Sequence, residues 1–283
     1  MNDESVSSHD LTPYHFDLLA GFLRKESGIV LKPENSYSLR AKLLPLAREW
    51  GFDGLDHLVT HIHRQRHNRE VVEALLDALT IKETSFFRDA KPFDVLRRRI
   101  LPDLAAKRGT RPLKLWSAAC STGQEAVTLA ILLQQVLHAE RAQRSVVVGT
   151  DVSEDAIARA RKAVYSQLEV ERGLSADLLL RFFEPVAAGY RPAQSLQRLI
   201  RYQSVNLVDT DFPLSQFDVV MCRNVLIYFD DEGKRRALDT IYRRMAQDGY
   251  LITGAGEDPQ RVDPRFQRVL VDGLQCFRKG PEG

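Results

Sequence analysis

The stretch from Leu115 to Ile131, LWSAACSTGQEAVTLAI, decides the fold of this chain. A short apolar run leads into a polar loop and then into a second apolar segment long enough for a helix, so the order is strand, loop, helix. Sheets built from such units hold nucleotide-like ligands at the carboxyl ends of their strands. The loop has one glycine, Gly123, where a dinucleotide-binding loop has three. The pattern therefore predicts a ligand-binding loop but not a dinucleotide.

Downstream of residue 112 the same alternation continues. Helices are expected from about Gly123, Glu154 and Asp231, and short apolar or β-branched runs between them predict strands. Such alternation predicts a Rossmann-like, doubly wound α/β fold with a mostly parallel sheet. FQRVLVDGLQCFRKG at the end of the chain predicts a closing antiparallel hairpin. The expected strands are LKLWSA (113–118), SVVVGTD (145–151), IRYQSVNL (200–207), FDVVMCRN (217–224) and GYLITGAG (249–256).

The chain divides near residue 82. Residues 1–82 carry helix signals and no strand signals, which predicts a small all-helical N-terminal domain, and residues 83–283 form the α/β domain with an insertion at about 165–203. Thr12 and Gly28 bound the first helix. Pro45 is expected to kink or end the second, which lies around residues 36–51. Two further helices are predicted at 55–66 and 69–79.

Composition excludes several classes of protein. No apolar run reaches 18 residues and the N-terminus is polar and acidic, so we expect neither membrane insertion nor a signal peptide. We therefore expect a cytoplasmic protein. A net charge of +2 is too balanced to predict nucleic-acid binding. Three separated cysteines suggest neither disulfides nor a zinc site. We expect a solvent-facing position rather than metal ligation for His57, His61, His63 and His67.

Two carboxylates follow neighbouring predicted strands. Glu125 lies in the first turn of the helix after Gly123, where it would repel a phosphate but pair with a cation. Asp151 ends the next strand, the usual place for an acceptor of ribose hydroxyl groups. Each has a structural alternative, because acidic residues also begin helices and cap them. Together they favour a ligand with a ribose and a positive group but no phosphate, and S-adenosylmethionine has these features.

A third strand runs directly into polar residues. Arg223, Asn224 and then Tyr228 follow the apolar run from Phe217. Polar side chains at a strand end suit a binding site. A surface ion pair for Arg223 and simple packing for Tyr228 remain open alternatives.

Five segments, in this order, resemble the chemotaxis receptor methyltransferases of the CheR type: TSFFRD (84–89), WSAACSTGQEA (116–126), GTDVSEDAIARARKAVYS (149–166), SVNL (204–207) and FDVVMCRNVLIYFD (217–230). The resemblance covers nearly the whole chain, including the helical N-terminal domain. It implies a sheet of the class I methyltransferase type. It also implies an enzyme that transfers a methyl group from S-adenosylmethionine to glutamate side chains of chemoreceptors, leaving S-adenosylhomocysteine.

The resemblance also implies roles for single residues. Arg88 would pair with the methionine carboxylate of the cofactor, Glu125 with its ammonium group and Asp151 with its ribose. A domain-junction salt bridge is the alternative for Arg88. The remaining cofactor residues would be Lys82, where the family usually has asparagine, together with Thr84, Gly123, Asn206, Leu207, Arg223 and Asn224. Because a glutamate is already an anion at neutral pH, no general base is expected. Tyr228 or Arg223 would orient the acceptor carboxylate.

The partner implied by the resemblance is the acidic helical bundle of a chemoreceptor. Arg40, Lys42 and Arg48 in the N-terminal domain could form a complementary face, and a solvated helix surface explains them equally well. The insertion has one glycine in EPVAAGYRPAQ (184–194), which does not favour binding of a receptor's C-terminal pentapeptide. Two rival functions remain: a methyltransferase for another substrate, such as RNA or a small molecule, and a non-catalytic module that binds S-adenosylmethionine or S-adenosylhomocysteine.

Overall fold

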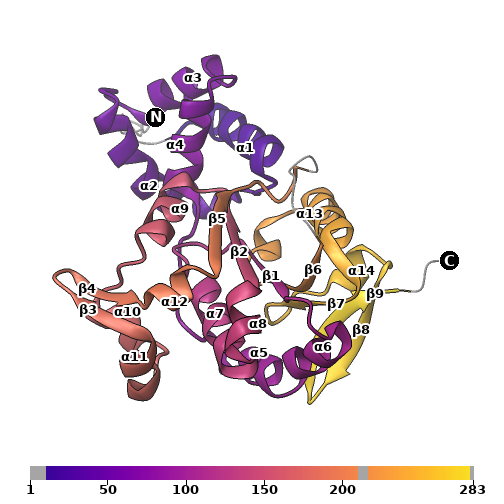
Figure 1. Ribbon diagram of the computed structural model, residues 1–283. Coiled ribbons are helices and arrows are strands. Elements are labelled where there is room, and N and C mark those ends of the chain that lie inside the picture. The colour runs from indigo at the N-terminus through magenta and orange to yellow at the C-terminus, as the bar shows by residue number, and fades with distance from the viewer. Residues whose placement is uncertain (1–10, 210–215, 281–283) are drawn as a thin grey trace, which may run out of the picture. The chain divides into compact units, whose positions relative to one another are not determined.

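The computed structural model describes residues 11–209 and 216–280. The chain forms two compact units, one of residues 1–81 with 228–233 and one of residues 82–227 with 234–283. The first unit is helical (Figure 1). Its elements are α1 (Pro13–Ser27), the 3-10 turn η1 (Pro33–Asn35), α2 (Ser36–Glu49), α3 (Leu55–Arg64) and α4 (Arg69–Leu79).

The ends of α1 follow from its sequence. The hydroxyl of Thr12 accepts from the backbone N–H of His15, Pro13 occupies the first turn, and Gly28 closes the helix at φ 75°. Leu19 and Leu23 are buried on one face of α1, and Leu39 and Leu43 are buried on α2. The predicted amphipathic helices are thus present.

Pro45 lies inside α2, so of the two alternatives expected for it the helix end is wrong and the kink stays a prediction. The expectation for His61 is also wrong. His61 does not face solvent: it is half-buried, and its ring lies 5.8 Å from that of Trp50 and 5.0 Å from that of Phe52. An imidazole packs there as an aromatic ring, so helical periodicity alone did not place it. His57, His63 and His67 are exposed as expected.

The second unit contains a seven-stranded sheet in the order β5-β2-β1-β6-β7-β9-β8. Neighbours from β5 to β7 pair in parallel, and β9 pairs antiparallel with both β7 and β8. The predicted mostly parallel sheet with a closing hairpin is confirmed. Its strands are β1 (Lys114–Ala118), β2 (Val146–Asp151), β5 (Ile200–Ser204), β6 (Phe217–Cys222), β7 (Met245–Thr253), β8 (Phe266–Val271) and β9 (Leu274–Lys279).

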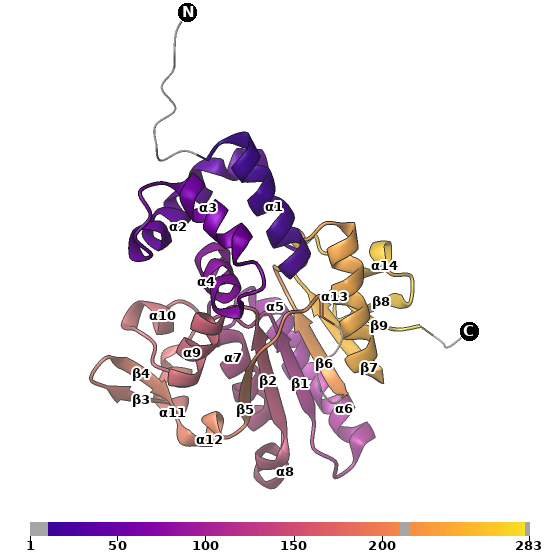
Figure 2. The same cartoon turned by 90° about the horizontal axis from the view of Figure 1, so that it is seen from above.

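Helices lie on either side of this sheet (Figure 2). Every residue of β6 is buried, as expected of a central strand covered on both faces. A hydrophobic core cluster joins Leu115, Val147 and Met221 of the sheet to α7, including Ile131. The helical segments of this unit are α5 (Ala90–Val95), η2 (Leu96–Ile100), α6 (Leu101–Arg108), α7 (Gln124–Val136), α8 (Ala139–Arg144), α9 (Glu154–Lys162), α12 (Gln194–Gln197), η3 (Leu226–Tyr228), α13 (Asp231–Arg244) and α14 (Pro259–Val262), with the end of η3 and the start of α13 in the first unit.

Between α9 and β5 the chain leaves the sheet. This segment forms α10 (Gln167–Glu171), α11 (Ala176–Phe182) and a separate two-stranded sheet of β3 (Phe183–Val186) and β4 (Gly189–Pro192). Ser166 begins α10 with a capping box to Glu169. None of the helices in the described parts of the chain is long and apolar enough to cross a membrane.

Candidate functional site

The strand order of the sheet reverses at β1. One half of the sheet runs from β1 to β2 and β5, and the other runs from β1 to β6 and β7. Ligands of open parallel sheets bind outside the carboxyl ends of the strands at this reversal. The candidate site is therefore surrounded by the residues that come directly after Ala118 of β1, Thr150 of β2 and Cys222 of β6.

The loop after β1 has an unusual backbone. Ala119, Ser121 and Gly123 have positive φ angles of 61°, 51° and 97°. For non-glycine residues such conformations cost roughly 1–3 kcal/mol each, and they cluster at functional sites. The loop is held by backbone hydrogen bonds from Cys120 N to Thr150 O (2.8 Å) and from Gly123 N to Cys120 O (3.1 Å). Its backbone thus turns sharply at the place where a ligand would approach.

Asp151 fastens this loop to the end of β2. Its Oδ2 accepts from Ser121 N (2.8 Å) and its Oδ1 accepts from Ser153 N (3.0 Å). A carboxylate has about four acceptor positions, so two remain for a ligand. Burial raises the pKa of Asp151, and the hydrogen bonds from Ser153 and Ser121 oppose that rise. The N-cap of α9 is Ser153, whose side chain accepts from Ala156 N, and not Asp151.

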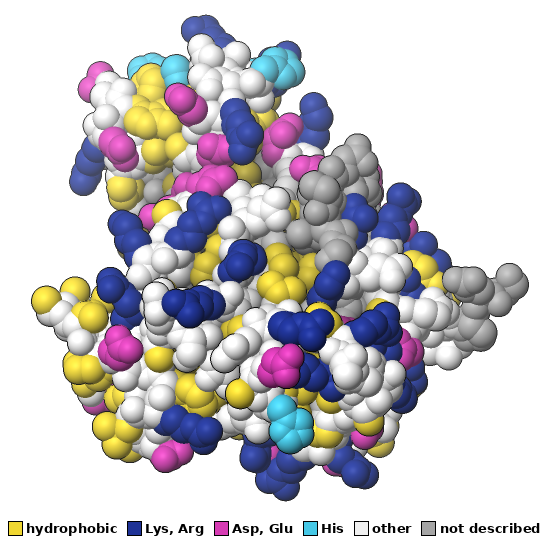
Figure 3. All heavy atoms as spheres, viewed as in Figure 1, with side chains coloured by type: hydrophobic (Ala, Val, Ile, Leu, Met, Phe, Trp, Pro, Cys, Tyr) yellow, Lys and Arg dark blue, Asp and Glu magenta, His cyan; other side chains and the backbone are white. Residues whose placement is uncertain are grey.

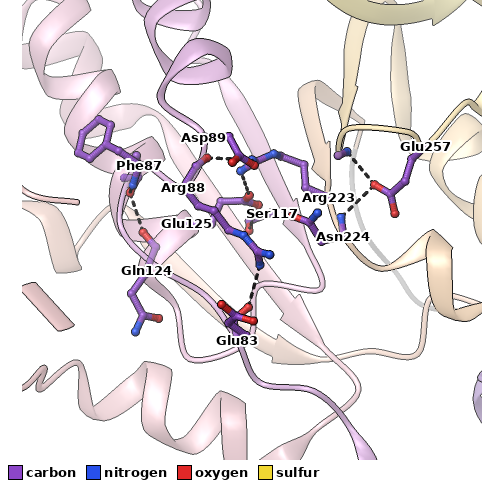
Figure 4. Close-up of polar contacts among 12 residues, drawn as sticks. Glu83, Phe87, Arg88, Asp89, Ser117, Gln124, Glu125, Arg223, Asn224 and Glu257 are labelled. Atoms are coloured by element: carbon purple, nitrogen blue, oxygen red, sulfur yellow. Dashed lines mark hydrogen bonds and ion pairs between the residues drawn. The ribbon is translucent and has the colours of Figure 1, made fainter. Parts of the chain in front are cut away.

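Glu125 lies at the start of α7 and bridges the two halves of the site (Figure 4). Its Oε1 accepts from the hydroxyl of Ser117 (2.7 Å), and its Oε2 accepts from Nη1 of Arg223 (3.1 Å). The carboxylate is mostly buried but 12% exposed. Each oxygen keeps an acceptor position, so Glu125 can still receive a donor from a ligand.

Arg223 is the central cation of this group. Its side chain is 3% exposed, and Nη2 donates to Asp89 Oδ2 (2.7 Å) and to Arg88 O (2.8 Å). The guanidinium lies 5.4 Å from the centre of the Phe93 ring. The ion pair considered from the sequence therefore exists, with Arg223 buried, its partner Glu125 mostly buried and its partner Asp89 61% exposed. Its main effect is to fix Glu125 and the 88–89 backbone in place.

Phe87, Asp89 and Asn224 also have positive φ angles, of 48°, 56° and 58°. With Ala119 and Ser121 they make up five of the seven non-glycine residues with positive φ in the described parts of the chain. Strain is therefore concentrated in three segments that Arg223 and the sheet bring together. This concentration supports a functional site at the switch point.

The other predicted cofactor residues lie on the same segments. Lys82 Nζ pairs with Asp155 Oδ2 (2.8 Å), while its carbonyl accepts from Ser121 Oγ (3.0 Å). Nη1 of Arg88 donates to Glu83 O (3.1 Å), and Thr84 is half-buried between them in the chain. The hydrogen bond from Ser121 places Lys82 beside the loop after β1.

Asn206 and Leu207 follow β5. The backbone bond from Val205 N to Asp151 O (2.9 Å) brings this segment next to Asp151. The Oδ1 of Asn206 accepts from Val208 N (3.3 Å), and Leu207 is buried. Tyr228 belongs to the helical unit, where its carbonyl accepts from Val30 N (2.9 Å).

Four residues of the site were not predicted. Ser117, Asp89 and Glu257 contribute the hydrogen bonds that hold Glu125, Arg223 and the chain after β6. The hydroxyl of Tyr202 lies 3.4 Å from Gly123 O, beneath the loop. The only available signal was position at a strand end for Glu257, which follows β7.

The donors and acceptors fit a specific kind of ligand. The site has two carboxylates with spare acceptor positions and one glycine in its loop, so it suits hydroxyl and ammonium groups rather than a pyrophosphate. S-adenosylmethionine has these groups. Within the described residues, no group of three or more His, Cys, Asp or Glu side chains is arranged to hold a metal ion.

Comparisons with known proteins agree with this geometry. Residues 82–272 match the family model "CheR methyltransferase, SAM binding domain", and residues 14–80 match "CheR methyltransferase, all-alpha domain". Chemotaxis protein methyltransferase 1 of Pseudomonas aeruginosa is 36% identical over 258 residues, which cover 90% of this chain and 93% of the relative. The chemotaxis protein methyltransferase of Vibrio parahaemolyticus is 36% identical over 251 residues, 88% of this chain and 90% of the relative.

Among solved structures, a TehB-like SAM-dependent methyltransferase from Corynebacterium glutamicum aligns with 68% of this chain and 96% of its own at 17% identity and a TM-score of 0.40, a likeness too low to carry an argument. The two family models and the two relatives show the family of this chain. The chain belongs to the CheR methyltransferases, and residues 82–272 form its S-adenosylmethionine-binding domain.

Proposed function

We propose that this methyltransferase esterifies glutamate side chains in the cytoplasmic helical bundles of chemoreceptors. The two relatives are named as chemotaxis protein methyltransferases, which supports this class of substrate. The observation that carries the proposal is that the described residues of the second unit hold one histidine, His138, at the opposite end of α7 from Glu125, whereas a glutamate acceptor needs no general base.

The histidine and cysteine candidates for a general base in this unit are unsuitable for physical reasons. Within residues 82–283 the one histidine is His138, which immediately precedes α8, at the opposite end of α7 from Glu125. Burial raises the pKa of the Cys120 and Cys222 thiols well above the ordinary value. Burial also raises the pKa of Tyr202. An acceptor that is already ionised, with a pKa near 4.3 like that of glutamate, suits such a site.

The cofactor residues have distinct proposed roles. Asp151 accepts hydrogen bonds from the ribose hydroxyls, and Glu125 accepts from the ammonium group. Arg88 pairs with the methionine carboxylate, because its guanidinium can bind a carboxylate through two N–H groups. At Gly123, in this proposal, the protein backbone comes close to the cofactor. The other residues that contact the cofactor in this proposal are Lys82, Thr84, Asn206, Leu207, Arg223 and Asn224.

When bound, S-adenosylmethionine would supply its sulfonium methyl group to a carboxylate oxygen, giving the methyl ester with S-adenosylhomocysteine as the leaving group. The protein contributes position and exclusion of water rather than proton transfer. Arg223 is held by Glu125 and Asp89, so it supplies a fixed positive charge near the reacting groups. Tyr228 is the second candidate for orienting the acceptor.

On the receptor side, we propose that the helical domain contacts the bundle. Residues 1–81 hold nine Lys and Arg against twelve Asp and Glu, so any attraction to an acidic bundle must be local. Lys42 is half-buried and donates to Leu79 O (2.8 Å). It also lies about 200° around α2 from Arg40, at 100° per residue. Arg48, which is exposed, is therefore the better candidate for such a face.

The test is incubation of the protein with methyl-labelled S-adenosylmethionine and a receptor cytoplasmic fragment. Base-labile label on the fragment, lost when its methylated glutamates are replaced by alanine, is the expected result. Label on RNA added in parallel would indicate another substrate. Binding of S-adenosylhomocysteine without transfer to any acceptor would indicate a non-catalytic module, and either result would overturn the proposal.

A further inference from the structure

A buried carboxylate lies next to the proposed site and has no role in it so far. Glu257 follows β7 and is 5% exposed. It accepts four backbone N–H groups, from Asn224, Val225, Ile227 and Gly254. Figure 4 shows it beside Asn224, and the described residues provide no ion pair for it. A buried charge is tolerated there because four N–H dipoles converge on it.

The four hydrogen bonds are divided between the two oxygens. Oε2 accepts from Asn224 N (2.9 Å) and Gly254 N (2.7 Å). Oε1 accepts from Val225 N (3.0 Å) and Ile227 N (3.3 Å). Glu257 thereby ties the chain that leaves β6 to the end of the neighbouring strand β7.

The carboxylate is itself anchored. Glu257 N donates to Gly254 O (3.1 Å), and Thr253 Oγ1 donates to Glu257 O (2.9 Å). Position 254 must be glycine for this arrangement. A Cβ there would lie 2.7 Å from Glu257 Oε2 and 2.9 Å from Asn224 Nδ2.

The segment held in this way is the one that carries two proposed cofactor residues. Asn224 has a φ of 58°, a strained conformation that its surroundings must enforce. Arg223, one residue earlier, reaches Glu125 and Asp89. A small rotation of the peptide at Asn224 would move both side chains.

We propose that Glu257 is a positioning residue for methyl transfer, which fixes the backbone from Asn224 to Ile227 and through it the side chains of Arg223 and Asn224. It acts through these two residues and does not touch the reacting atoms. The inference rests on the proposed function for the role of Arg223 and Asn224, and on the structure alone for the carboxylate and its four donors.

Glu257→Gln is the most informative variant. An amide has one oxygen, so whichever way it is oriented its NH₂ group faces two N–H donors, either those of Asn224 and Gly254 or those of Val225 and Ile227. We expect kcat/KM for the receptor fragment to fall about 100-fold, as for a small misplacement of catalytic groups. Affinity for S-adenosylhomocysteine should fall about tenfold by the same reasoning.

Glu257→Asp keeps the charge but withdraws both oxygens by one methylene. It should therefore also lose activity, and it carries the test if Glu257→Gln does not fold. Asp263→Asn is the matched control, because Asp263 is 7% exposed and accepts from Arg265 N (3.0 Å) outside the proposed site. It should lower the melting temperature while leaving kcat, KM and affinity within about twofold, since no catalytic group moves.

Amide hydrogen exchange gives a readout that needs neither cofactor nor substrate. Peptides covering Asn224 to Ile227 should exchange faster in Glu257→Gln than in the wild type, and those in β1 should not. Unchanged exchange with unchanged affinity, or a fully active Glu257→Asp, would overturn the inference. If the wild type binds S-adenosylhomocysteine but methylates no receptor glutamate, the proposed function fails, and exchange and affinity still decide the role of Glu257.

Discussion

Replacing Asp151 by asparagine should weaken cofactor binding more than any other neutral substitution in the β2 strand. The carboxylate holds Ser121 N and Ser153 N and, in the proposed site, also accepts from two ribose hydroxyls. A hydrogen bond to a charged group contributes about 1.5–3 kcal/mol. The asparagine keeps one acceptor oxygen, so losing one of the two ribose contacts should raise the Kd roughly 10- to 150-fold.

The same substitution also affects the free protein. The asparagine offers one acceptor oxygen, so either Ser121 N or Ser153 N loses its partner, at about 1–3 kcal/mol of unfolding free energy. Calorimetric titration with S-adenosylhomocysteine should therefore be accompanied by urea unfolding. Glu154→Gln, which removes a charge three residues further on in the first turn of α9, should leave the Kd within about threefold, as expected for a surface charge. Equal affinities for the wild type and Asp151→Asn would refute the assignment of Asp151 to the ribose.

Three further outcomes are expected. Arg223→Met should lower the free energy of unfolding by about 3–5 kcal/mol in urea titrations, because it leaves the mostly buried Glu125 carboxylate without its cation; a loss below ~1 kcal/mol would contradict this. Gly123→Ala should weaken S-adenosylhomocysteine binding, since its φ is 97° and a Cβ would lie 2.7 Å from the hydroxyl of Tyr202, whereas Gly21→Ala in α1 meets nothing and should stabilise by about 0.5–1 kcal/mol. Because burial raises the pKa of Asp151, affinity should begin to fall on acidification at a higher pH than an ordinary aspartate would give, and Asp151→Asn should abolish that step.

The sign of this pH dependence differs for stability. A carboxyl group whose folded pKa is raised binds its proton more tightly in the folded state, so its ionisation opposes folding. The contribution of Asp151 to the unfolding free energy is therefore most favourable at low pH. It declines as the pH rises from the ordinary pKa to the raised one. Across this pH range the unfolding free energy of the wild type should therefore fall relative to that of Asp151→Asn as the pH rises.

Local patterns in the sequence predict much of this fold. The Thr12 and Gly28 signals define α1 because caps act within one turn, and the apolar runs define the parallel strands because central strands are buried on both faces. Position at a strand end was enough to select Glu125, Asp151 and Arg223. These features depend on neighbours in the chain.

The contacts that the sequence does not reveal join residues that are far apart in the chain. The bond from Arg223 to Asp89 spans 134 positions, and the one from Asn224 to Glu257 spans 33. Neither can be inferred without the strand order. The helical segment from Ala90 to Arg108 also has no counterpart among the helices expected from the sequence. Pro45 shows the converse, because α2 continues through a residue type that commonly ends a helix.

The central claim is that the carboxyl ends of β1, β2 and β6 form the S-adenosylmethionine site. The most direct test is a crystal structure of the protein with S-adenosylhomocysteine. The account predicts the ribose hydroxyls within hydrogen-bonding distance of the Asp151 carboxylate, the ammonium group at Glu125 and no displacement of Arg223 from Glu125. A ribose bound away from Asp151, or a ligand that separates Arg223 from Glu125, would contradict it.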